Sequence, residues 1–232
     1  MGNTPTVAGG WRQQARLYLH PSALLLLVQL LEIVLYPATR DTPAGRALLG
    51  IVGAAVLLLA LRLIHHTQGL VWHAALLAVA AIVLNIAWAV FGGTSLQAWQ
   101  AGLEALLYFY TARCLIGYML ADRRATRDEL FAAAATFTLL VWAFTELLVL
   151  CQLLQPAAFT GAGAPGDPRS WSELIFLSFA MFTNTGIGTT VPMSAASRAI
   201  GDIEMFSGVM YLALVVSRLV GLVTATGARK QR

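Results

Sequence analysis

Long apolar stretches separated by short connectors run along almost the whole chain. Most of them approach the roughly 20 residues that a helix needs to cross a hydrocarbon core of about 30 Å. The connectors carry glycine, proline or charged residues, which interrupt helices. The pattern predicts an all-α protein with six membrane-spanning helices. We place these spans at Ser22–Pro37, Ala47–Ile64, Leu70–Phe91, Leu96–Ala121, Leu130–Leu154 and Ile203–Ala225.

A shorter apolar stretch follows the fifth predicted span. Ser170 stands three residues before Glu173, which is the spacing of a capping box at the start of a helix. A helix from Trp171 to Phe182 would extend about 18 Å at 1.5 Å per residue, roughly half the thickness of a bilayer. The chain must then stop at mid-depth and return to the same side. We therefore predict a re-entrant segment within residues 155–202.

The sequence TNTGIGTT follows this short helix. Irregular backbone at membrane depth is stable only where it is buried in protein or lines water, so the stretch is expected to line a water-filled path. Its two glycines permit the left-handed dihedrals that let successive carbonyls face one axis. The helix C-terminus adds a partial negative charge of about half an electron, which favours a cation. One loop forms only one wall, so four chains would be needed to close a ring.

The order of half-helix, T-x-x-G-x-G and a following helix with a central glycine resembles the pore module of the tetrameric potassium channel superfamily. The resemblance covers about Asp122 to Leu222, and is to small bacterial members with six spans. It implies a selectivity filter that binds potassium or another monovalent cation through backbone carbonyls, with Thr189 at the outer mouth. The filter residues would be Thr183, Asn184, Thr185, Gly186, Ile187 and Gly188.

Other residues take roles from the same resemblance and from their positions. Glu173, in the capping box, and Glu204, at the start of the inner helix, are expected to support the pore. Gly208 lies inside the inner helix, where glycine costs about 1 kcal/mol relative to alanine, so it is either a gating hinge or a site of close helix packing. The linker residues that would couple the pore to the preceding spans are Arg123, Arg124 and Arg127.

Three positions depart from the pattern of that superfamily. Threonine is usual where Asn184 stands, an aromatic residue where Ile187 stands, and often aspartate where Thr189 stands. Ile187 cannot make the phenolic hydrogen bond that braces the filter, and Thr189 removes a ring of four charges. We therefore expect relaxed selectivity for potassium over sodium.

Composition and charge agree with a membrane protein. Hydrophobic residues make up 58% of the chain and charged residues 11%, against about 25% charged in soluble domains. The net charge of +4 does not indicate nucleic-acid binding, because the basic residues stand at the ends of apolar runs. By the positive-inside rule both termini are cytoplasmic, in a multi-pass protein of the cell inner (plasma) membrane. The two cysteines lie in apolar runs and form no metal-ligand pattern.

The first four spans match those of six-span channels only in number and placement. A voltage sensor needs several basic residues at every third position, and the fourth span has only Arg113. We predict little voltage dependence and a structural role for Arg113. The chain divides into an N-terminal four-helix membrane domain at 1–121 and a pore domain at 122–232.

Three glutamates fall in the outer parts of their spans. Glu32, Glu104 and Glu146 either form an acidic cluster or pair with Arg40 and Arg46. We favour pairing with the arginines.

Two functional classes follow from these observations. The leading hypothesis is a homotetrameric channel in a lipid bilayer that conducts monovalent cations, mainly potassium and with some sodium. The alternative is a non-conducting regulatory or assembly subunit that keeps the pore fold with a diverged filter. No nucleophile with a base, phosphate-binding loop or metalloenzyme pattern occurs, so neither enzyme activity nor a cofactor is expected.

Overall fold

The structure is a computed structural model that describes residues 21–39, 53, 68–121, 127–161, 167–217 and 220–221. The described part is mostly helical, as predicted. Its helices are α2 (Pro21–Thr39), α4 (Gln68–Phe91), α5 (Thr94–Ala121), α6 (Arg127–Leu154), α7 (Trp171–Phe182) and α8 (Ala195–Tyr211), which continues into the π-helical turn η1 (Leu212–Val216). Two short strands, β1 (Phe159–Thr160) and β2 (Val191–Pro192), pair antiparallel.

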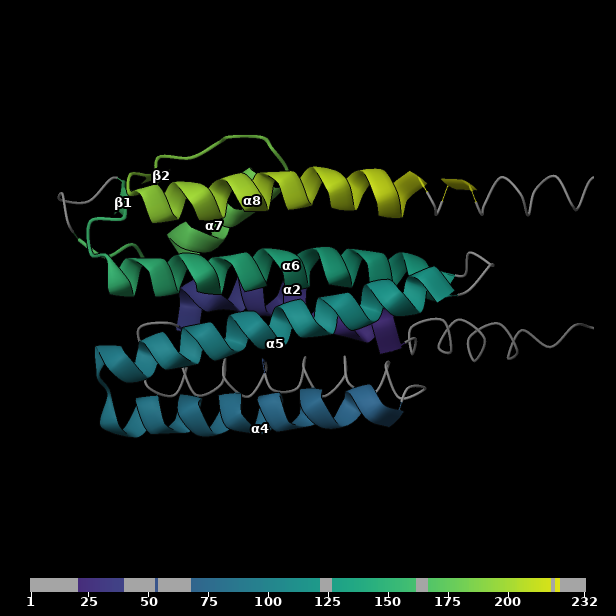
Figure 1. Cartoon of the computed structure of the whole chain (residues 1–232), viewed down its shortest axis with the longest axis horizontal. Helices are drawn as coiled ribbons and strands as arrows, with labels where there is room; N and C mark the ends of the chain where they lie inside the picture. Colours follow the sequence, from purple (N-terminus) through teal and green to yellow (C-terminus); the bar gives the residue numbers. More distant parts are fainter. Residues whose placement is uncertain are drawn as a thin grey trace, which may run out of the picture.

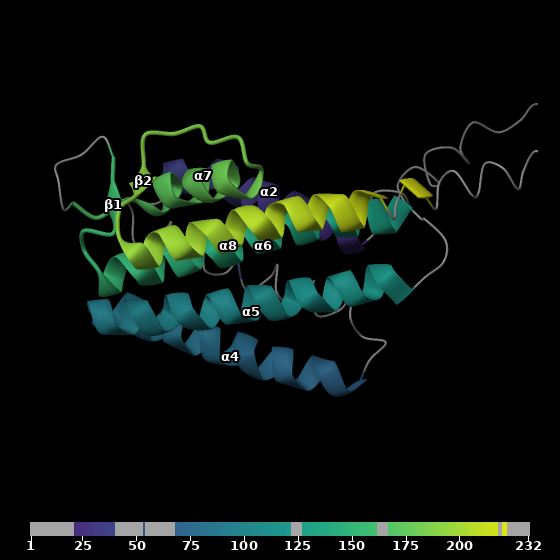
Figure 2. The ribbon, with the colours of Figure 1, turned by 45° about the horizontal axis from the view of Figure 1, so that its top comes forward.

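The long helices α4, α5, α6 and α8 lie side by side along the long axis of the molecule (Figure 1). Helix α2 packs on α6, and Figure 2 shows it on the same side of α6 as the short helix α7. The chain reverses between α4 and α5 at Gly92 and Gly93, whose φ values are 65° and 96°. Left-handed dihedrals of this kind are easily adopted by glycine, which explains why both helices stop there.

The buried core lies between α5, α6 and the ends of α7 and α8. The aromatic rings of Phe137, Phe182 and Tyr211 pack together, with ring centroids 5.1 Å apart for Phe137 and Phe182 and 6.3 Å apart for Phe182 and Tyr211. The Tyr211 hydroxyl also donates a hydrogen bond to the carbonyl of Ala133 on α6. Aromatic pairs of this geometry contribute about 0.5–1.5 kcal/mol each beyond burial. The end of α7 is therefore anchored in the middle of the bundle.

The predicted spans agree with the helices where these are described, except at the start of the last one. Helix α8 begins at Ala195, earlier than the predicted Ile203, because Ser194 caps it by accepting a bond from the Ser197 amide at 3.1 Å. The first turns of α8 are too polar to be recognised as part of a membrane span from their hydrophobicity, so the predicted span begins too late. The second predicted span lies outside the described residues except for Gly53.

Within the described part of the chain, only α6 is both long and apolar enough to cross a membrane, over Asp128–Leu154. The apolar parts of α2 and α4 are shorter, at Ser22–Tyr36 and Ala75–Trp88. A buried core helix of a soluble protein meets the same criteria of length and composition. The arrangement of six spans therefore stays a prediction.

Candidate functional site

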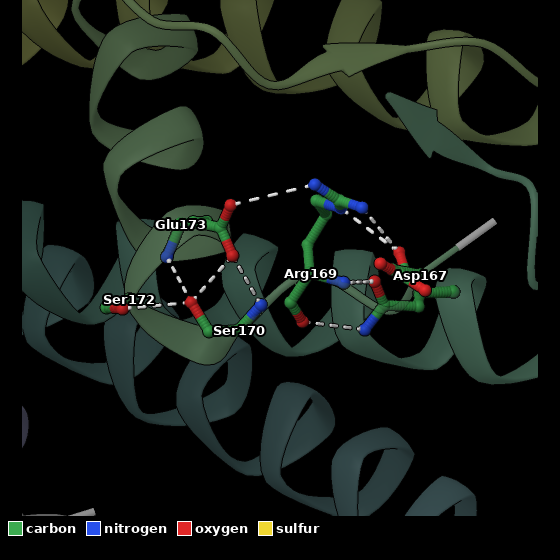
Figure 3. Close-up of polar contacts among 6 residues, drawn as sticks. Asp167, Arg169, Ser170, Ser172 and Glu173 are labelled. Carbon is green, nitrogen blue, oxygen red and sulfur yellow. Dashed lines mark hydrogen bonds and ion pairs between the residues drawn. The ribbon is translucent and has the colours of Figure 1, made fainter. Parts of the chain in front are cut away.

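The short helix α7 begins with the capping box that its sequence predicts. The Ser170 hydroxyl accepts from the Glu173 amide at 3.3 Å, and the Glu173 carboxylate accepts from the Ser170 amide at 2.8 Å. Figure 3 shows both bonds at the first turn. They satisfy N–H groups that the start of a helix leaves free. The helix then ends at Phe182, as expected.

A buried arginine fixes the segment just before α7 (Figure 3). Arg169 is 5% exposed, and its guanidinium donates twice to the Asp167 carbonyl and lies 3.9 Å from the Glu173 carboxylate. The Gln152 side chain on α6 bonds both the amide and the carbonyl of Arg169, at 2.6 and 3.0 Å. Gly161 makes room, because a Cβ there would be 2.7 Å from Arg169 Nη1. The sequence alone does not predict this role, since no local pattern relates Gln152 to Arg169.

The loop after α7 has an alternating backbone conformation. Thr183 has φ of −84°, whereas Asn184, Gly186 and Gly188 have φ of 56°, 65° and 147°. Every second residue from 184 to 188 is thus in the left-handed region, as expected for the two glycines but not for Asn184. Alternation between right-handed and left-handed dihedrals turns successive peptide groups to the same side of the chain. A row of carbonyl ligands also needs successive peptide groups on one side of the chain, and the alternation of φ is compatible with that arrangement.

Hydrogen bonds hold the start of the loop to α7 and α8. The amides of Thr185 and Gly186 both donate to the Ala180 carbonyl, at 2.9 and 3.2 Å. The Asn184 amide nitrogen Nδ2 donates to the Met205 carbonyl on α8 at 3.2 Å. The Asn184 side chain therefore ties the loop to the following helix, which explains how a residue other than glycine is held at positive φ.

The outer part of the loop leaves space beside α7. A pocket of about 570 Å³ is lined by the first turns of α7, including Glu173 and Phe176, and by Ile187, Gly188, Thr189 and Thr190. Ile187 remains 65% exposed although it borders this space.

Beyond the pocket, the Ala158 carbonyl accepts from the Met193 amide at 2.8 Å and the Ser197 hydroxyl at 2.9 Å. The chain is thus fixed again directly after the loop.

Glu204 and Gly208 of α8 both lie against α7. Glu204 is fully buried and bonds the Ser178 hydroxyl, which also donates to the Val141 carbonyl at 2.8 Å. Gly208 is buried, and a Cβ added there would be 1.9 Å from the Phe182 carbonyl oxygen. Helix α8 continues without a break through Gly208. This geometry favours the close-packing role of Gly208, while its role as a hinge stays a prediction.

The linker residues of the candidate site are only partly described. Arg123 and Arg124 lie outside the described residues, and Arg127 begins α6 at the end opposite to Gln152. Arg113 is exposed on α5. The coupling role of the linker therefore stays a prediction.

The three glutamates of the N-terminal helices and α6 come together. Glu146 interacts electrostatically with Glu104 and Glu32, and Gln100 donates to Glu104 at 3.2 Å. The acidic cluster is thus present. The favoured pairing involves Arg40 and Arg46, which lie outside the described residues, so it stays a prediction. In the described segments, no group of three or more histidine, cysteine, aspartate or glutamate side chains is placed to hold a metal ion.

Comparisons with protein-family models, curated proteins and solved structures find no match to this chain. The interpretation of the site therefore depends on its own geometry.

Proposed function

We propose that the protein is a homotetrameric cation channel that conducts potassium with relaxed selectivity and little voltage dependence. The observation that carries the proposal is the alternation of φ along Thr183–Gly188 at the end of a capped half-length helix. Such a backbone directs several carbonyls toward one axis, where they replace the hydration shell of a cation. The α7 macrodipole places its negative end beside the same loop.

The exposure of the loop supports assembly from several copies. Residues 183–189 are exposed in the single chain, and their carbonyls would form one wall of a coordination cage. Four identical walls around an axis would complete it. In this proposal the chain crosses the bilayer six times, and both termini are cytoplasmic.

Relaxed selectivity follows from the outer half of the loop. Ile187 has no hydroxyl to bond with α7, and it borders a pocket of about 570 Å³ instead of filling it. Loosely held carbonyls discriminate less between ions of different size where selectivity depends on the fit of the ion to the filter. The same pocket favours the second candidate function, a non-conducting regulatory or assembly subunit with a diverged filter.

Reconstitution of the purified protein in planar bilayers tests the proposal. We expect a cation current with modest preference for potassium in bi-ionic reversal potentials and a shallow dependence on voltage. Gly186→Ala should abolish or strongly reduce the current, because alanine in the left-handed region costs about 1–2 kcal/mol and would distort the alternation. Gly117→Ala is the matched control, since Gly117 on α5 is exposed and has open space around its Cβ position.

The alternative predicts a different result. A tetramer in native mass measurements that carries no cation current under any condition would favour the non-conducting subunit. A stable monomer would contradict both the fourfold assembly and a selectivity filter formed by four chains.

A further inference from the structure

The first residue of α7 is held by two helices that lie far from it in the sequence. Trp171 Nε1 donates to Glu146 Oε1 on α6 at 2.8 Å. The Trp171 ring packs against Tyr36 on α2, with ring centroids 4.4 Å apart and planes inclined by 37°. Trp171 also contacts both buried hydrophobic clusters of the protein. One side chain thus joins α2, α6 and α7.

The acceptor of this hydrogen bond belongs to the acidic cluster. Glu146 is 8% exposed and interacts electrostatically with Glu104 on α5 and Glu32 on α2. An intramolecular hydrogen bond of this kind contributes about 0.5–1.5 kcal/mol, and it depends on where the acceptor oxygen lies. The positions of α2 and α5 therefore affect the carboxyl group that holds Trp171.

We propose that Trp171 is the positioning residue through which the N-terminal helices set the orientation of α7 and of the loop that follows it. The inference rests on the proposed function, because α7 can orient a selectivity filter only if the loop at residues 183–188 is a selectivity filter. Helix α7 is a single twelve-residue unit, so a shift at Trp171 is transmitted to Phe182 and the loop. This route is independent of the linker at residues 122–126.

Three variants separate the parts of the contact. Trp171→Phe keeps a ring against Tyr36 and removes the N–H donor. Glu146→Leu removes the acceptor, whereas Glu146→Gln keeps one. Trp99→Phe is the control for loss of an indole, because Trp99 is 74% exposed on α5.

The first measurement is hydrogen exchange of the α7 amides in the full-length protein, which does not depend on conduction. We expect Trp171→Phe and Glu146→Leu each to raise exchange in the first turn about tenfold, because each removes the same hydrogen bond. The double variant should show no more than either single variant, and Glu146→Gln and Trp99→Phe should resemble the wild type. The inference would be overturned if the increases in exchange of the two single variants multiplied in the double variant. It would also be overturned if both single variants exchanged at the wild-type rate.

The second measurement is the ratio of potassium to sodium permeability. We expect both Trp171→Phe and Glu146→Leu to change it, with rescue in Glu146→Gln. Tyr36→Leu should act in the same direction, whereas Tyr36→Phe keeps the ring and should not. A wild-type current with unchanged permeability in all these variants would overturn the inference. Absence of wild-type current would instead refute the proposed function, and exchange would still decide whether Trp171 positions α7.

Discussion

Replacing Gly208 with alanine separates the two roles that this glycine can have in α8. If Gly208 is only a flexible point, alanine should stabilise the helix by about 0.8–1.0 kcal/mol through its higher helix propensity. If Gly208 is a site of close packing, the added methyl group must displace a neighbour. The two roles therefore predict opposite signs for the change in the free energy of unfolding.

The structure gives the size of the displacement. A Cβ at position 208 would lie 1.9 Å from the Phe182 carbonyl oxygen, 2.7 Å from its carbonyl carbon and 3.1 Å from its Cα. Carbon and oxygen atoms in contact are about 3.3 Å apart, so the two helices must separate by roughly 1.4 Å. All three neighbouring atoms are backbone, so no side-chain rotation can relieve the contact. Overpacking costs typically 1–3 kcal/mol, and because only backbone atoms can move here we expect the upper part of that range, about 2–3 kcal/mol, which exceeds the gain in helix propensity by about 1–2 kcal/mol.

The consequence reaches the candidate filter because Phe182 directly precedes Thr183. We expect Gly208→Ala to lower the stability of the purified protein by about 1–2 kcal/mol, measured by denaturant unfolding in detergent, and to reduce cation current in bilayers. Gly117→Ala, at an open position in α5, should instead stabilise the protein by about 0.8–1.0 kcal/mol. Reduced current alone fits either role, so stability is the deciding assay. A Gly208→Ala protein at least as stable as the wild type would refute the close-packing argument.

Substitutions at two further positions test the surroundings of the loop. Glu204→Gln should keep wild-type stability, because it keeps the shape and an oxygen acceptor beside Ser178. Glu204→Leu should cost about 0.5–1.5 kcal/mol, because it removes one hydrogen bond while the Ser178 hydroxyl keeps the Val141 carbonyl as acceptor. Equal thermal stability of the two variants would contradict this. Ile187→Tyr should raise the potassium preference in bi-ionic reversal potentials, since the tyrosine ring and its hydroxyl are larger than the isoleucine side chain and can enter the pocket beside Glu173. Unchanged reversal potentials would exclude the pocket as the cause of relaxed selectivity.

Local sequence patterns predicted the parts of the site that local forces determine. The start of α7 follows from the Ser170 and Glu173 capping box, and the left-handed dihedrals of Gly186 and Gly188 follow from the absence of a side chain. The end of α4 and the start of α5 follow similarly from two adjacent glycines. In each case the determining residues lie within one turn of the feature.

Contacts between distant residues could not be predicted in this way. The bond from Trp171 to Glu146 joins residues 25 positions apart, and Gln152 reaches Arg169 over 17 positions. The positive φ of Asn184 depends on the Met205 carbonyl of another helix. These features depend on how the helices pack, for which one sequence gives no direct signal.

The two ends of α7 are fixed by different parts of the molecule, and this division has a mechanical consequence. Trp171 at the first turn is bonded to α6 and packed on α2, whereas Phe182 at the last turn lies against Gly208 of α8. A short rigid helix held at both ends converts a displacement at either end into a rotation of the loop that follows. Movement of the N-terminal helices and movement of α8 should therefore both reach the loop, but by separate contacts. On this reasoning a Trp171→Phe and Gly208→Ala double variant should combine the two effects on permeability additively in free energy, and strong non-additivity would mean that the two contacts are coupled and do not reach the loop separately.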